Sequence, residues 1–243
     1  MADFPAIPRF LPPLLSVVAG YVDSCTFLAL FGLFVAQVTG SFVLTGTQLV
    51  VHEDAGLIKL IGIPVFFVAC AVTTLIVDGI GRRGRSALAA ALGLETVLLL
   101  GLFTCWLVAG PFRGPNTAAA IVASVFGLFA MGVQSALTRL VAKGVPSTNV
   151  MTTNTSQFAI DTTELVLAWR AHRRSPADAV AADALASALG RFNTIWPVVL
   201  GFVVGTITGA LGYEHFGMWC ILAPIALAGG LAAWASGGGK TSG

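Results

Sequence analysis

Six stretches of this chain are each long and apolar enough to cross a lipid bilayer as a helix. A crossing needs about 20 predominantly apolar residues. The stretches are residues 10–32, 57–79, 87–110, 116–138, 192–212 and 216–236. Only 10% of the 243 residues are charged and 56% are hydrophobic, whereas soluble domains carry about 25% charged residues. The sequence therefore predicts an all-α, polytopic membrane protein with six transmembrane helices, and the composition excludes a soluble enzyme.

The distribution of Lys and Arg predicts that both termini are cytoplasmic. With six spans and an inner N-terminus, eleven basic residues lie inside and only Lys59 and Arg113 lie outside. The inner residues are Arg9, Arg82, Arg83, Arg85, Arg139, Lys143, Arg170, Arg173, Arg174, Arg191 and Lys240. This arrangement satisfies the positive-inside rule. The net charge of +2 is too small for nucleic-acid binding.

Two further segments, 34–51 and 148–169, are apolar but rich in Thr, Ser, Asn and Gly. If both crossed the membrane, the basic residues would divide eight to five, which fits the positive-inside rule less well. We therefore expect broken or re-entrant segments that enter from opposite faces. Irregular backbone at membrane depth is tolerated only where protein buries it or where it lines a water-filled cavity.

The second half of the chain repeats short motifs of the first half in the same order. The pairs are Val22–Ser24 with Val133–Ser135, Val38–Ser41 with Met151–Asn154, and Ile63–Val65 with Trp196–Val198. We interpret residues 1–243 as one membrane domain built from an inverted 3+3 repeat, 1–113 and 114–243, an arrangement typical of secondary transporters. Chance matches in an apolar chain are the alternative.

The second half also contains a hydrophilic insert, residues 170–190, that has no counterpart in the first half. Ser175 as N-cap, Pro176 at the first position and Gly190 at the end predict a short cytoplasmic helix there.

The chain also resembles the YoaK-like family of bacterial membrane proteins, domain of unknown function 1275. The residues that carry the resemblance are Gly20-Tyr21-Val22-Asp23, Phe34 through Ser41, Glu95, Met131 through Ser135, and Val145 through Asn154. The chain departs from the family pattern at Ser41, Ser135 and Thr153, where Asn, Asn and Gly are usual. The resemblance implies a bacterial inner-membrane protein with about six spans, and it implies no activity.

Asp23 and Glu95 are acidic residues within predicted spans. An acidic side chain near the bilayer centre costs about 2.5–3.5 kcal/mol on insertion scales, and burial disfavours its charged form. No basic residue lies inside a span to pair with either carboxyl. We interpret them as proton- or ion-coupling groups; the alternative is a protonated carboxyl that hydrogen-bonds a neighbouring helix.

Uncharged polar residues of the two ambiguous segments are candidates for a polar cavity lining. Together with Gln134 they predict a substrate-binding set for a small polar solute or an alkali cation: Thr39, Gly40, Ser41, Thr45, Gln134, Thr152, Thr153 and Asn154. The alternative is that these side chains cap short helices and satisfy their own backbone.

A stripe of glycines in the fifth span, Gly201, Gly205 and Gly209, predicts a close helix contact. The partner helix belongs either to the same chain or to a second copy in a homodimer. The four cysteines lie far apart in apolar stretches and are expected to be buried hydrophobic residues. The sequence has no Ser/His, paired-carboxylate or metal-ligand motif, so we expect neither an enzyme nor a metal or cofactor site.

These features favour a small secondary transporter, or permease, of a small solute, coupled to protons or a cation. A non-transporting membrane scaffold or assembly partner is the alternative function.

Overall fold

The computed structural model describes residues 8–51, 57–81, 86–141, 146–148 and 150–237, and within these ranges the chain is helical with no β-strand. In chain order the elements are α1 (Leu11–Ala29), α2 (Val38–Val51), α3 (Leu57–Gly81), α4 (Ala87–Ala109), α5 (Ala118–Val141), α6 (Met151–Arg174), α7 (Ala179–Phe216), the 3-10 helix η1 (Gly217–Ile221) and α8 (Leu222–Gly237). The chain is thus a bundle of apolar helices, which confirms the predicted all-helical class.

Five helical runs are long and apolar enough to cross a membrane. Four of them lie in α1, α3, α4 and α5. The fifth run, Ala179–Gly237, takes in α7, η1 and α8 together. The last two predicted spans both fall within this run, and α8 by itself has 16 residues, fewer than the roughly 20 of a perpendicular crossing. The polytopic character is confirmed, whereas the number of six spans stays a prediction.

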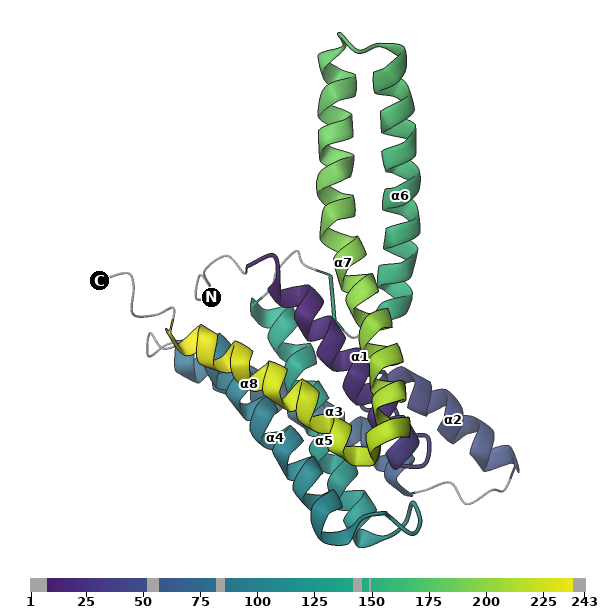
Figure 1. The fold of residues 1–243 in the computed structure, drawn as a ribbon, viewed down its shortest axis with the longest axis vertical. Helices are drawn as coiled ribbons and strands as arrows, with labels where there is room; N and C mark the ends of the chain where they lie inside the picture. The colour runs from purple at the N-terminus through teal and green to yellow at the C-terminus, as the bar shows by residue number, and fades with distance from the viewer. Residues whose placement is uncertain (1–7, 52–56, 82–85, 142–145, 149, 238–243) are drawn as a thin grey trace.

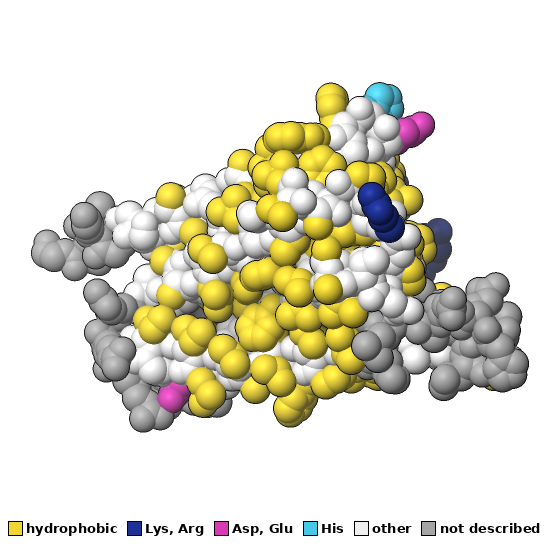
Figure 2. Space-filling model, turned by 90° about the horizontal axis from the view of Figure 1, so that it is seen from below, with side chains coloured by type: hydrophobic (Ala, Val, Ile, Leu, Met, Phe, Trp, Pro, Cys, Tyr) yellow, Lys and Arg dark blue, Asp and Glu magenta, His cyan; other side chains and the backbone are white. Residues whose placement is uncertain are grey.

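The surface of the bundle is itself apolar. Large side chains that point outward include Phe67 and Leu75 on α3, Val108 on α4 and Ile207 on α7, each at least half exposed. Figure 2 shows hydrophobic side chains covering most of the bundle seen from below, with few charged side chains among them. A soluble protein rarely exposes so much contiguous apolar surface, so this surface fits contact with lipid.

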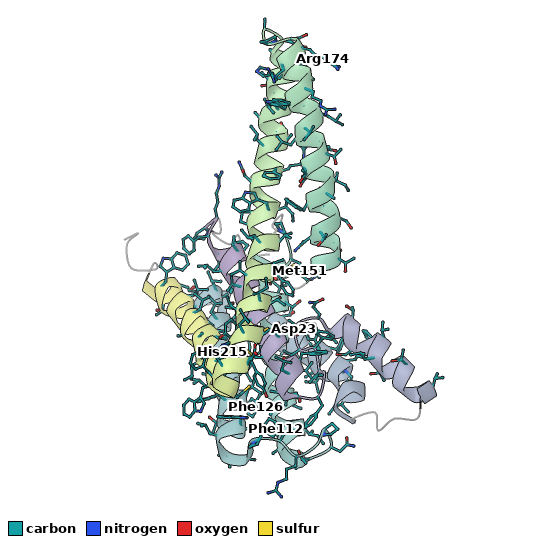
Figure 3. All side chains as sticks on the ribbon, turned by 45° about the vertical axis from the view of Figure 1, so that its right-hand side comes forward. Asp23, Phe112, Phe126, Met151, Arg174 and His215 are labelled. Carbon is teal, nitrogen blue, oxygen red and sulfur yellow. The ribbon has the colours of Figure 1, made fainter. Side chains whose placement is uncertain are left out.

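The two ends of the bundle differ. In Figure 1, the hairpin of α6 and the first half of α7 projects from the end where α1 begins and α8 finishes. The turn between α4 and α5 lies at the opposite end. Arg174 marks the tip of the hairpin and Phe112 the opposite end in Figure 3. The hairpin tip therefore lies on the same side of the bundle as the start of α1 and the end of α8.

The glycine stripe of α7 packs against α1 of the same chain. A Cβ on Gly201 would lie 2.6 Å from the Pro13 carbonyl oxygen, and one on Gly209 would lie 2.6 Å from that of Tyr21. Gly205 meets the carbonyl oxygen of Val17 in the same way, even more closely. These glycines are buried, so they are not a free surface for a second copy. The homodimer therefore stays a prediction, and its contact surface is no longer the glycine stripe.

The predicted short helix in the insert 170–190 is wrong. Helix α6 continues through Arg174, and α7 starts at Ala179 with Asp178 as its N-cap, whose carboxylate accepts the N–H of Val180 at 2.9 Å. Gly190 does not end a helix, because α7 runs on to Phe216. The insert is instead the tip of the α6–α7 hairpin. Pairing along α6 holds α7 helical through Gly190 where the isolated sequence suggests an end.

The two segments expected to be broken are regular helices preceded by irregular turns. Residues 38–51 form α2 and residues 151–174 form α6, so the irregular backbone is confined to 30–37 and to the stretch before Met151. Within the helices, hydroxyls bond back to the preceding turn: Thr45 to the Ser41 carbonyl at 2.7 Å and Thr162 to the Phe158 carbonyl at 2.6 Å. These polar residues are therefore compatible with an unbroken helix.

Two cysteines that are far apart in the sequence meet where α1 ends and η1 begins. The Sγ atoms of Cys25 and Cys220 lie 3.1 Å apart, and both cysteines are free thiols. Each side chain is buried, as expected, but their pairing was not predicted. The contact arises because Gly217, with a φ of 56°, turns the chain at the end of α7 and brings η1 back to α1.

We expect a cysteine at Gly114 and a cysteine at Ser175 to face opposite sides of the membrane. In sealed cells, a membrane-impermeant maleimide should label Gly114→Cys and should label Ser175→Cys only after permeabilisation. The parent chain is the control, because its native cysteines are buried or half-buried. Labelling of both positions in sealed cells would contradict the arrangement in Figure 1.

Two glycines of α7 provide a matched test of the α1–α7 contact. Gly205→Ala should lower the free energy of unfolding by about 1–3 kcal/mol, because its Cβ would meet the α1 backbone. Gly190→Ala should leave stability unchanged or raise it by up to about 1 kcal/mol, because no atom lies within 4 Å of its Cβ. Thermal unfolding of the purified variants in detergent measures both changes. Equal loss in both variants would show that the contact is not specific.

Candidate functional site

Asp23 holds the irregular turn that connects α1 to α2. Its Oδ1 accepts the backbone N–H groups of Val35 and Ala36, both at 2.8 Å. The turn reverses through two left-handed residues, Phe31 with φ 56° and Gly32 with φ 80°. A left-handed conformation is costly for a residue with a side chain and persists where the surroundings hold it. The Asp23 carboxyl supplies that hold from inside the bundle.

The second oxygen of Asp23 is available for other chemistry. Asp23 is 3% exposed, and its Oδ2 is buried without a hydrogen bond from the described residues. The carboxyl lines a cavity of about 200 Å³, the Asp23 pocket, together with Ser24, Gln37 and Thr206 among others. In Figure 3, Asp23 lies between Met151, at the base of the hairpin, and Phe112, at the far end of the bundle. One oxygen thus stabilises the fold, while the other has no hydrogen bond from the described residues.

Gln134 on α5 has a comparable position before the second irregular turn. Its Nε2 donates to the Leu15 carbonyl at 2.8 Å and to the Thr148 hydroxyl at 3.1 Å. Gln134 is fully buried. Gln134 therefore links α5 to α1 and to Thr148, which precedes α6.

Ser41 and Asn154 make the same kind of bond in the first turns of α2 and α6. The Ser41 hydroxyl donates to the carbonyl of Phe34 at 3.3 Å, and the Asn154 amide donates to the carbonyl of Ser147 at 2.5 Å. Each bond reaches back seven residues to the irregular turn before the helix. Both side chains are buried, and each fixes the entry of its helix into the bundle.

The starts of α2 and α6 meet at a cavity of about 430 Å³, the central cavity. Its lining comes from residues 36–39, from α3, from the end of α5 and from 150–152. The polar side chains there are Gln37, Thr39, Thr74, Ser135, Arg139 and Thr152. Two residues of the predicted binding set, Thr39 and Thr152, are therefore brought together although 113 positions separate them.

A larger cavity of about 1240 Å³, the hairpin cavity, lies between α5, α6 and α7. Thr153 and Asn154 of the predicted set line it, with Asp161 and Arg191 deeper in the hairpin. Asp161 is 3% exposed and accepts the Gln157 amide at 2.9 Å, and Arg191 bridges to Glu164 at 2.5 Å. The acidic groups of this cavity are thus already engaged by neighbouring side chains.

The three cavities adjoin one another through shared lining residues. Arg139 and Val150 line both the hairpin cavity and the central cavity. Gln37 lines both the central cavity and the Asp23 pocket. Three neighbouring cavities with shared lining residues therefore occupy the region between the projecting hairpin and the buried carboxyl of Asp23.

Arg139 is a candidate site residue that was not predicted as one. From the sequence it served only to predict which side of the membrane each loop faces. It lies in the last turn of α5 and is the one charged residue among the described residues lining the central cavity. The sequence did contain a signal for this role. Arg139 comes before the Thr-rich segment 148–169 and stands at the end of the span that holds Gln134. Its role depends on the approach of α2 and α6, which the sequence does not specify.

The remaining members of the predicted binding set have packing roles. A Cβ on Gly40 would lie 3.1 Å from the Phe34 ring, and Ser41 and Thr45 bond backbone carbonyls. Gln134 bonds the backbone of α1. None of these four lines the three cavities described above, so contact with a solute stays a prediction for them.

Glu95 is buried differently from Asp23. It is fully buried on α4, and neither carboxyl oxygen has a hydrogen bond from the described residues. It lines none of the three cavities. In the part of the chain that the structure describes, no three His, Cys, Asp or Glu side chains gather closely enough to bind a metal ion.

Comparison with protein families gives one match, to the model of a protein of unknown function, DUF1275, over residues 11–234. The chain belongs to the DUF1275 family. The match covers every helix from α1 to all but the last residues of α8, so the resemblance expected from the motifs is confirmed. Comparisons with curated proteins and with solved structures find no match.

The departure of this DUF1275 member from the family pattern at Ser41 has a structural explanation. The pattern has Asn where this chain has Ser41, and Asn154 occupies the equivalent place in α6. Both residues bond a carbonyl seven residues earlier, so Ser41 keeps the bond with a shorter side chain. Its bond is correspondingly longer, 3.3 Å against 2.5 Å.

Two substitutions of Asp23 should separate its structural role from its charge. Asp23→Ala should lower the free energy of unfolding by about 1–3 kcal/mol, because two buried N–H groups lose their acceptor. Asp23→Asn should lower the free energy of unfolding by less, since the amide oxygen of Asn can still accept both N–H groups. Thermal unfolding in detergent measures the difference. Equal stability of the two variants would contradict the proposed hold on the turn.

Proposed function

We propose that this DUF1275 protein is a secondary transporter of a small solute, coupled to protons or another cation through Asp23. The observation that carries the proposal is the group of three neighbouring cavities, one of which is lined by a buried carboxyl with one oxygen that has no hydrogen bond from the described residues. Ionisable groups inside a membrane protein commonly mark substrate or ion pathways. The structural role uses Oδ1 and does not account for a carboxyl that lines a pocket.

The proposal includes the inverted repeat expected from the sequence, and the packing of the helices supports it. The matched motifs pair α1 with α5 and α3 with α7, and in the fold α1 packs along α7 while α5 packs along α3. Each half thus packs its first long helix on the third helix of the other half. The bonds of Ser41 and Asn154 correspond, and Pro64 and Pro197 lie in corresponding helices. Binding sites of inverted-repeat transporters lie where the two repeats meet.

The proposed location is the bacterial inner membrane, with both termini and the α6–α7 hairpin on the cytoplasmic side. The basic residues support this orientation, because Arg173 and Arg174 lie near the hairpin tip, and Arg139 lies in the last turn of α5, at the end of that helix away from the α4–α5 turn. The hairpin cavity then opens toward the cytoplasm, and the central cavity and the Asp23 pocket lie deeper.

Transport gives Asp23 a role that Glu95 lacks. A coupling group must exchange a proton or a cation with the solute path, and Asp23 lines that path while Glu95 lines none of the three cavities. We therefore assign coupling to Asp23 alone. The part of the earlier prediction that concerns Glu95 stays untested.

The test is proton movement in proteoliposomes that contain the full chain. With a pH-sensitive dye inside, addition of candidate solutes should elicit proton movement with the native chain. Asp23→Asn should reduce that movement at least tenfold, and Glu95→Gln, a matched loss of a buried carboxylate, should leave it within about twofold. These variants keep similar size and hydrogen-bonding atoms, so a shared folding defect is not expected.

Undiminished proton movement in Asp23→Asn would rule out the coupling role even if transport persisted. Absence of solute-elicited movement with the native chain, together with a stable copurifying partner, would favour the alternative function of a membrane scaffold.

A further inference from the structure

The central cavity has an unbalanced positive charge. Among its described lining residues Arg139 is charged and none is acidic. Arg139 forms no ion pair with a described residue, whereas Arg191 in the hairpin cavity is engaged by Asp161 and Glu164. Arg139 is exposed, and an arginine without an ion pair beside a cavity whose described lining has no acidic side chain is suited to an anion.

Two helix N-termini face the same cavity. Helix α2 begins at Val38 and α6 at Met151, and Val38, Thr39, Val150 and Thr152 line the cavity. The first N–H groups of a helix have no intrahelical partner, and they carry a partial positive charge. No side chain caps α6 at Val150, and neither helix has an acidic residue in its first turn.

Ser135 supplies a third, independent feature. It is 7% exposed and lines the cavity from α5, and its hydroxyl has no hydrogen-bond partner among the described residues. A serine hydroxyl can donate a hydrogen bond to an anion. The Ser135 hydroxyl therefore remains available to a ligand in the central cavity.

We infer that the transported solute is a small anion, bound in the central cavity by the N-termini of α2 and α6, Ser135 and Arg139. The inference rests on the proposed transport function, because it names the solute class of the same path. The cavity of about 430 Å³ admits an inorganic oxoanion with several waters or a short organic acid. Half-helix N-termini that face an anionic group from two repeats are an established device in transporters.

The position of Arg139 at the end of α5 leaves two sources for the anion. A soluble anion would enter through the hairpin cavity, which Arg139 also lines. The phosphate of an anionic lipid would approach from the membrane surface. The shared chemistry is an oxyanion, and the depth of Ser135 and of the α2 N-terminus favours the soluble source.

The test measures binding to the purified full chain in detergent. Thermal unfolding is followed in sodium nitrate, sodium phosphate or sodium acetate, against sodium gluconate of equal ionic strength as the bulky reference anion. Choline gluconate tests for a cation effect, and phosphatidylglycerol tests the lipid source. A ligand that binds the folded state raises the unfolding midpoint saturably with concentration, which gives its Kd.

We expect at least one of the three anions to stabilise the native chain saturably. Arg139→Gln should weaken that Kd about tenfold or more, and Ser135→Ala should weaken it by a smaller factor. Arg173→Gln is the matched control, because Arg173 lies over the Trp169 ring near the hairpin tip, and it should leave the Kd unchanged. If Arg139→Gln does not fold, the Kd of Ser135→Ala for the anion tests the inference instead.

Stabilisation by none of the three anions would overturn the inference, as would an unchanged Kd in both site variants. Stabilisation by phosphatidylglycerol alone would also overturn it, because the cavity would then hold a lipid headgroup. Anion binding without any transport would leave this site in place and refute the proposed function. Solute-elicited proton movement without anion binding would support the proposed function and overturn the inference of an anion site.

Discussion

The structure depends on how two stretches of irregular backbone are satisfied inside an apolar bundle. Lipid offers no hydrogen bonds, so each N–H and C=O group outside a helix needs a partner from the protein. Asp23 supplies that partner for the turn before α2, whereas Gln134 bonds the Thr148 hydroxyl before α6 and the Leu15 carbonyl of α1. Both are buried and both reach from a long apolar helix. Without them the starts of α2 and α6 would not be held near the centre of the molecule.

The same requirement produces the candidate site. Because α2 and α6 begin within the bundle, residues of their first turns line the central cavity. Arg139 lines this cavity, Asp23 lines the neighbouring pocket, and Gln37 lines both. The candidate site thus combines a basic and an acidic side chain that form no ion pair with each other.

Much of the fold follows from local patterns, and the errors have identifiable causes. Hydropathy located each apolar helix, because the length and composition of a crossing segment are local properties. The insert 170–190 was misread, because Ser175 and Gly190 resemble helix ends in isolation. In the fold, pairing with α6 keeps α7 continuous. The hydroxyls of α2 and α6 likewise suggested broken helices, whereas they bond to their own backbone.

The sequence by itself determined that this chain belongs in a membrane and that Asp23 requires an explanation, because both conclusions need only the cost of placing polar groups in lipid. It also marked the polar residues around 39 and 152. Only the tertiary structure decided which of them share a cavity, since that depends on how helices distant in sequence approach one another. Arg139 became a site residue, and Ser41 and Thr45 became packing residues, for the same reason: side-chain neighbours are set by helix packing and not by spacing along the chain.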